Sequence, residues 1–450
     1  MALYDKNSNV TGSGATVPTR NFMETVSEML PRPDKQYKIE SSIENSQTRD
    51  FLPNNTNLFT GHIDDNFVEF NFAGSANEMV DLSSIALEVK GSIVKGDGTA
   101  LAAADNVTLV DGFHHRLIAS HSLSLNGTEV ESNSSFGLYN NIKVITQMGK
   151  SNVDTIGRCM FYKTLDTKIP SEILASYFST QLPASERDIV SDAKNGTIHS
   201  VGPLLLDIAD ADNFLLPGID VRLRLDLASP SILINSANET YKYNITLCKL
   251  WVKMVKIYPT ALLSLNRSLF DKSKSLEYVF ERPIVKTIIF PANQTSLTVD
   301  CPFNNLIPHK MIAFLINQKN LSGEFNKNSL HIPHCNVSNI KIDINGSSVS
   351  NISTSFPHFV TNALYRTLEV IGKNNLLTHK NFSNGRTVYA FDLRSSNSTD
   401  TLSLDKHGTM RVSITTSTPL DKNHVLYLIG MTTGVVEITG DGNVYKNYLM

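Results

Sequence analysis

Apolar and polar residues alternate one by one through much of this 450-residue chain, and that period of two is what most constrains its fold. Successive side chains of a β-strand point to opposite faces of a sheet, so alternation marks a strand with one buried face. Turn-forming Gly, Pro, Asn and Asp residues separate such stretches, which indicates an all-β (mostly β) chain built as sandwiches. Helical periodicity is clearest in Ser171–Ser179 and His358–Val370. The best strand candidates are Asn66–Phe72, Ile85–Val94, Val221–Leu227 and Ile340–Ile344.

Two short patterns recur in the two halves of the chain. Asn126-Gly127 and Asn345-Gly346 each follow an apolar strand-like run, and Asn-Gly tolerates the two positive φ angles of a type I′ hairpin turn. Asp207 and Asp392 each lie between apolar residues, upstream of a further strand-like run. The two patterns have different offsets between the halves, which predicts an insertion in the first half. Together they favour two copies of one β fold.

The length of the chain suits two domains of about 200 residues each. Residues 1–45 are polar and have no sustained period, so we predict an N-terminal arm, disordered alone or ordered by a neighbouring subunit. The predicted domains are then residues 46–262 and residues 263–450.

Charge and cysteine content exclude several classes of protein. The net charge is −3 and no run of Lys and Arg occurs, which argues against direct nucleic-acid binding. The first residues, Met1–Lys6, lack the apolar region of a secretory signal, and no apolar stretch is long enough to cross a bilayer. Four cysteines are too few for a disulfide-stapled fold. We expect synthesis inside a cell, no secretion, and no glycans on sequons such as Asn106-Val107-Thr108.

Motifs that carry chemistry are nearly absent, so we predict no enzyme, no catalytic residue, no cofactor and no metal. His331, His334 and Cys335, with Cys301 as a distant fourth ligand, have a faintly metal-like composition, but on a strand His334 would point away from the other two. For His114, His115 and His121 the default is a hydrogen-bonded loop or strand position. The lone tryptophan, Trp251, is predicted to pack in the core near the junction of the domains.

The most specific segment of the chain is 212–225, and further characteristic segments are 69–75, 87–99, 123–128, 250–259, 322–328, 389–393 and 434–444. Over roughly residues 25 to 450, the order of these segments resembles the major capsid (hexon) protein of Maverick/Polinton elements and adintoviruses. This resemblance implies two consecutive eight-stranded jelly-roll β-sandwiches, that is, a double jelly roll.

The resemblance also implies a function. Homotrimers of such a chain would form pseudo-hexagonal capsomers that tile an icosahedral shell around a double-stranded DNA genome. The expected location is the virion, and the expected partners are further copies, a penton protein of single jelly-roll type and other minor capsid proteins. Alternatives from other classes are a carbohydrate-binding or carbohydrate-processing β-sandwich and a capsid-derived host protein. Val10–Gly14 and Ile438–Gly442 resemble maturation-protease cleavage patterns, although the second also fits a hairpin turn.

Overall fold

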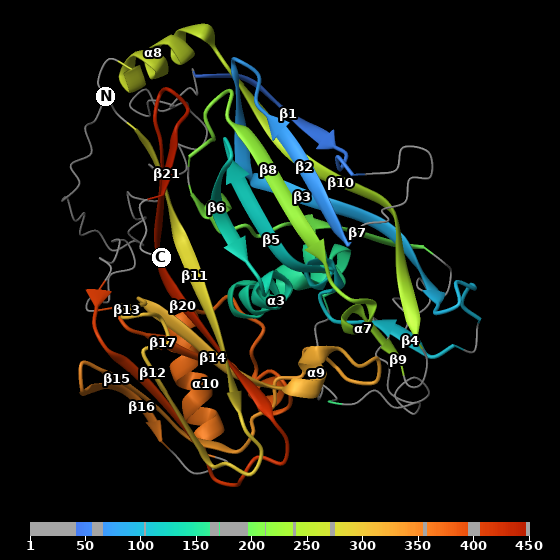
Figure 1. The fold of residues 1–450 in the computed structure, drawn as a ribbon, viewed down its shortest axis with the longest axis vertical. Helices are drawn as coiled ribbons and strands as arrows, with labels where there is room; N and C mark the ends of the chain where they lie inside the picture. The colour runs from blue at the N-terminus through green and yellow to red at the C-terminus, as the bar shows by residue number, and fades with distance from the viewer. Residues whose placement is uncertain are drawn as a thin grey trace, which may run out of the picture.

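The chain folds into two β-sandwich halves that pack against each other (Figure 1). Strands of the first half, blue to green, lie beside those of the second half, yellow to red, and helix α8 (Pro259–Phe270) follows the last strand of the first half. The computed structural model describes residues 42–55, 66–102, 105–162, 171, 197–211, 213–236, 240–270, 275–353, 358–394 and 406–446.

The first half consists of two antiparallel four-stranded sheets. One has the order β1-β10-β3-β7, formed by Ile43–Phe51, Tyr241–Ile257, Glu78–Lys95 and Ile198–Pro203. The other has the order β2-β8-β5-β6, formed by Phe67–Ala73, Asp220–Leu227, Ile118–Leu125 and Thr128–Asn133. A short pair, β4 (Val107–Leu109) and β9 (Ile234–Ser236), lies beside them.

The second half repeats this arrangement. Its first sheet has the order β11-β20-β14-β17, formed by Leu276–Phe290, His424–Ile438, Lys310–Asn317 and Tyr389–Asp392. The other has the order β12-β19-β15-β16, formed by Ser296–Asp300, Met410–Thr416, Val337–Ile344 and Ser347–Ser353. The short strands are β13 (Leu306–Ile307), β18 (Lys406–His407) and β21 (Val444–Lys446), which pairs with β20.

Among the described strands, the two halves have one topology. If the short strands are set aside and the others are counted along the chain, each half has one sheet of order 1-8-3-6 and one of order 2-7-4-5. The predicted strands lie in β2, β3, β8 and β15. Their inward-facing residues are buried, as Val68, Phe70 and Phe72 are on β2, and one continuous apolar core extends through both halves.

Both Asn-Gly pairs form the predicted turns. In the β5–β6 turn, φ is 46° at Asn126 and 78° at Gly127, and in the β15–β16 turn it is 51° at Asn345 and 78° at Gly346. The predicted insertion agrees with the connection between the fifth and sixth strands, which occupies 134–197 in the first half and only 354–388 in the second.

Among the described residues, α3 (Phe136–Gln147), α8 and α10 (His358–Ile371) are the helices of more than two turns. α10 confirms the predicted helix, and α3 occupies the equivalent connection in the first half. The sequence did not reveal α3, because it is buried almost all round and some of its buried residues, such as Asn140 and Asn141, are polar. The other short helices are α2 (Phe113–Arg116), α4 (Lys150–Asn152), η1 (Val153–Gly157), η2 (Ile208–Asp210), α7 (Pro230–Leu233), α9 (Gln318–Ser322) and α11 (His379–Ser383). None of the described helices is long and apolar enough to cross a membrane.

The prediction that Trp251 packs in the core is wrong. Its neighbours on β10, Leu250 and Val252, face the core, so the Trp251 ring faces outward and is half-buried. Its Nε1 donates to Glu88 Oε2 at 2.9 Å. The sequence held a signal for this orientation, because lysines lie two residues away on either side, at 249 and 253, and share its face.

The other sequence predictions fall in three groups. Ile438–Gly442 ends β20 and enters a turn in which Gly442 N donates to Thr439 O, so the hairpin interpretation is confirmed. Val10–Gly14, most of the arm, and the helix predicted for Ser171–Ser179 apart from its first residue lie outside the described residues. β1 begins at Ile43, inside the predicted arm, and the domain limits remain a prediction, with the boundary between residues 262 and 263 falling within α8.

Candidate functional site at the junction of the two halves

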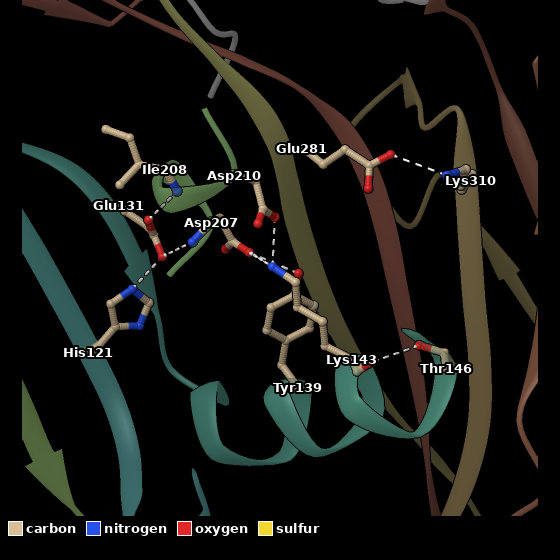
Figure 2. Close-up of polar contacts among 10 residues, drawn as sticks. All are labelled: His121, Glu131, Tyr139, Lys143, Thr146, Asp207, Ile208, Asp210, Glu281 and Lys310. Atoms are coloured by element: carbon tan, nitrogen blue, oxygen red, sulfur yellow. Dashed lines mark hydrogen bonds and ion pairs between the residues drawn. The ribbon is translucent and has the colours of Figure 1, made fainter. Parts of the chain in front are cut away.

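The first half presents α3 and η2 to the second half. η2 packs against β11, and the hydroxyl of Tyr278 on β11 donates to Phe214 O at 2.9 Å, just beyond η2. At the end of α3, Ile145 O accepts from Leu376 N at 2.9 Å. Figure 2 shows α3 and η2 beside β11 and β20, with a group of polar side chains between them.

Glu131 on β6 is the centre of that group. Its Oε1 lies 2.7 Å from His121 Nε2 on β5 and accepts the backbone N–H of Asp207 at 3.0 Å. Its Oε2 accepts the backbone N–H of Ile208 at 3.0 Å. Burial alone would raise the pKa of this carboxyl, but the charge and hydrogen bond of His121 and the two N–H donors lower it. The carboxylate therefore fixes the start of η2 to the sheet edge.

Asp207 and Asp210 join η2 to α3. The Tyr139 hydroxyl donates to Asp207 Oδ1 at 2.9 Å, and Lys143 Nζ lies 2.8 Å from Asp210 Oδ2 and 3.7 Å from Asp207 Oδ1 (Figure 2). Burial, followed by the negative charge of Glu131, raises the pKa of Asp207 well above its usual value. Lys143 is thus the ion-pair partner of Asp210, and Asp207 is the carboxyl that resists ionisation.

Further polar contacts cross the junction. Arg386 Nη2, in the second half, donates to Asp111 Oδ2, in the first half, at 2.5 Å. The amide of Asn126 donates to Gly442 O at 2.7 Å, so the tip of one hairpin touches the turn that follows β20. These contacts and the shared core make the two halves one packed body.

The histidines near this site are held by hydrogen bonds, as their default interpretation predicted. Nδ1 of His114 lies 2.6 Å from Ser200 Oγ and its Nε2 lies 3.2 Å from Gly202 O. Nδ1 of His115 lies 2.8 Å from the Tyr162 hydroxyl. Burial lowers the pKa of His114 to about 3 and that of His115 to about 4, so both rings are neutral across the physiological range.

The remaining candidate ligands are His331, His334, Cys335 and the distant Cys301. Burial lowers the pKa of His334 to about 4 and raises that of the Cys335 thiol to about 12. Cys335, like Cys301, lies at a positive φ angle between strands. Within the described residues, no three His, Cys, Asp or Glu side chains are grouped as a metal site requires.

The junction can hold the two halves together, and Glu131, Asp207 and Arg386 are buried in it, whereas Asp210 is 54% exposed. The sequence pointed to His121 and Asp207 but not to Glu131, Tyr139 or Lys143, which join them. The only local signal was the position of Tyr139 and Lys143, four residues apart and so on one face of α3.

Comparisons with known proteins bear on the fold. No family model matches the sequence, and no curated protein matches it. A chain in the structure of the Sputnik virophage has a TM-score of 0.60 at 9% identity, over 98% of this chain and 94% of that one. A chain of the PBCV-1 virus capsid has a TM-score of 0.57 at 11% identity, over 90% and 97%. The Faustovirus major capsid protein has a TM-score of 0.56 at 9% identity, over 95% of each.

The chain is a double jelly roll. The similar structures are double jelly-roll major capsid proteins of giant viruses and virophages. In this chain the first roll comprises β1 to β10 and the second comprises β11 to β20, and the site described above is the contact between the rolls. At such low identity, the likeness establishes the fold.

Proposed function

We propose that the chain is a major capsid protein whose homotrimers form pseudo-hexagonal capsomers that tile an icosahedral shell around a double-stranded DNA genome. The observation that carries this proposal is the repeat of one eight-stranded topology in a single chain, because three such chains place six equivalent rolls around a three-fold axis. The capsid chains of PBCV-1 and Faustovirus, which are matched over nearly their whole length, support it.

The role we propose is structural and not enzymatic. The buried ion pair between Arg386 and Asp111 suits that role, because it joins the two rolls of one chain. By the same proposal the protein resides in the virion and contacts further copies of itself, a penton protein and other minor capsid proteins. The order of segments that resembles Maverick/Polinton elements and adintoviruses supports placing the chain in that lineage.

The test is the mass of the purified full chain in solution, by light scattering after size exclusion. A stable species of three copies of 49.7 kDa, about 149 kDa, with near-hexagonal particles in electron micrographs, is the expected result. A monomer that persists at high protein concentration would overturn the proposal, and the carbohydrate-binding alternative would then be tested on glycan arrays.

A further inference from the structure

β10 and β20 are the eighth strands of their rolls, yet their outer faces differ. On β20 every residue from His424 to Thr432 is buried, so both faces of that strand are covered. On β10 only the core-facing side is buried, and the outward residues of its second half are half-buried. One topological position is therefore covered in the second roll and open in the first, within the described residues.

The first roll provides the cover on β20. Tyr427, near the start of β20, is 5% exposed and hydrogen-bonds the side chain of Ser135, at the start of α3. The buried guanidinium of Arg116, at the end of α2, lies close enough to Tyr427 for the two to influence each other electrostatically. The contact is heterologous, because the α3 side of one roll meets the β11–β20 side of the other.

The open equivalent in the first roll is the outward surface of β1 and β10, here called the β1–β10 face. Trp251 lies on this face near one end of the β1–β10 ladder, where it pairs with Asp50 of β1 on one side and Ala86 of β3 on the other. Its ring is held in place by the hydrogen bond to Glu88 and by Lys249, whose Nζ is 5.7 Å from the ring centre. A pre-ordered, half-buried tryptophan is the kind of residue that anchors protein interfaces.

The surface that could meet this face in another copy is the outer side of α10, because α10 is the second-roll equivalent of α3. Its inner residues, among them Val360, Ala363 and Thr367, are buried. Tyr365 on the opposite side is 61% exposed, the largest exposed fraction among the large apolar and aromatic residues described. α10 thus carries an uncovered aromatic where α3 carries the covered contact within the chain.

We propose that the outer side of α10 in one copy of the chain docks on the β1–β10 face of the next copy, with Trp251 and Tyr365 in the contact. This inference rests on the proposed capsid function and adds the surfaces that join the copies. The contact repeats between chains the head-to-tail packing of rolls within the chain, and three such contacts close a ring.

The test uses two variants of the full chain, Trp251→Glu and Tyr365→Glu. Each buries a charge in the proposed contact, so each alone is expected to be a folded monomer where the wild type is a trimer. A mixture of the two is expected to form a dimer of about 99 kDa and no trimer, because the intact α10 of one variant meets the intact β1–β10 face of the other. Ile156→Glu, at a residue 58% exposed and on neither surface, is the matched control and keeps the trimer.

Trp251 is also a built-in reporter, because the chain has one tryptophan. Its emission is expected at shorter wavelength, with weaker acrylamide quenching, in the wild-type trimer than in monomeric Tyr365→Glu. Equal emission in the two would mean that trimer formation does not cover Trp251 and would overturn the proposal. Trimers of both variants would overturn this inference and leave the capsid function standing, whereas a monomeric wild type would remove both. A mixture that stays monomeric would overturn the head-to-tail contact, and circular dichroism checks that each variant is folded.

Discussion

Arg386 and Asp111, which lie 275 residues apart in the sequence, form an ion pair across the junction of the two rolls. Nη2 of the arginine is 2.5 Å from Oδ2 of the aspartate, and 3% of the arginine side chain and 13% of the aspartate side chain are exposed. Next to it, the parallel bridge between Ile332 and Arg386 ties the same residue to a segment of the second roll. The pair is thus enclosed and fixes one roll to the other.

Removing the arginine should therefore be costly. Arg386→Ala leaves the Asp111 carboxylate buried, and loss of one partner from a buried pair lowers the free energy of unfolding by about 3–5 kcal/mol. The shift of the urea midpoint, followed by circular dichroism, measures this. Arg411→Ala is the matched control, because Arg411 and Asp300 are 58% and 63% exposed and such pairs contribute about 0–1 kcal/mol. Equal effects of the two substitutions would contradict the role assigned to Arg386.

Glu131→Gln should destabilise the first roll. The amide offers one acceptor oxygen, so the buried N–H of Asp207 or Ile208 loses its partner, at about 1–3 kcal/mol. The lowered pKa of Glu131 means that its contribution is present above the unfolded value of about 4.3 and is lost as the pH falls through the folded value. The difference in free energy of unfolding between wild type and variant should hence become smaller below about pH 4. Glu129→Gln, two residues away and exposed, should match the wild type throughout.

Asp207→Asn should instead change the stability of the fold at higher pH. Because the folded pKa of Asp207 is raised, its favourable contribution is complete below the unfolded value of about 3.9 and is lost as the pH rises through the folded value. Asparagine keeps the acceptor for Tyr139 and does not ionise, so the variant should equal the wild type in acid and exceed it in stability at higher pH. Unfolding curves at stepped pH values measure this, with Asp210→Asn, 54% exposed, as the comparison. Parallel pH curves for wild type and Asp207→Asn would refute the assignment.

Much of the fold was predictable because it is encoded locally. The alternation in Val221–Leu227 predicts a strand, and Asn345-Gly346 predicts a hairpin turn, whatever surrounds either segment. α3 was missed for the opposite reason. Its environment, and not its own pattern, makes it a buried helix, since it packs against α2 and β5 of its own roll and its two ends contact Tyr427 and Leu376 of the second roll.

The junction was mostly beyond the sequence. Glu131 and Asp207 are 76 residues apart, and nothing in either segment indicates that a carboxylate on an edge strand will accept two backbone N–H groups of η2. The size of Trp251 predicts burial, whereas the lysines at 249 and 253 indicate that its ring faces outward. Residue type suggested burial, while position on the strand decided which face it occupies.

The Asn-Gly turns test whether the two rolls are built alike at the level of single residues. Asn126 N donates to Asp220 O, at the start of the seventh strand, at 2.9 Å, and Asn126 Oδ1 accepts from Asp220 N at 2.8 Å. In the second roll, Asn345 N donates to Thr409 O at 2.8 Å and its Oδ1 accepts from Thr409 N at 2.9 Å. Each turn is therefore fastened to the neighbouring strand by the same asparagine contacts.

Gly127→Ala and Gly346→Ala should consequently lower the free energy of unfolding by the same amount. Both glycines have φ of 78°, and an added Cβ would meet nothing within 4 Å at either site, so only backbone strain of about 1–2 kcal/mol remains. Gly149→Ala, at φ −70° with its nearest contact at 3.4 Å, should be neutral or stabilise by about 0.4–1 kcal/mol. Urea unfolding of the three variants measures these free energies. A large loss of stability at one turn and none at the other would contradict this expectation. Because the two glycines have the same φ angle, such a difference would have to come from the strands that flank each turn, and the shared strand order would then not extend to shared turn energetics.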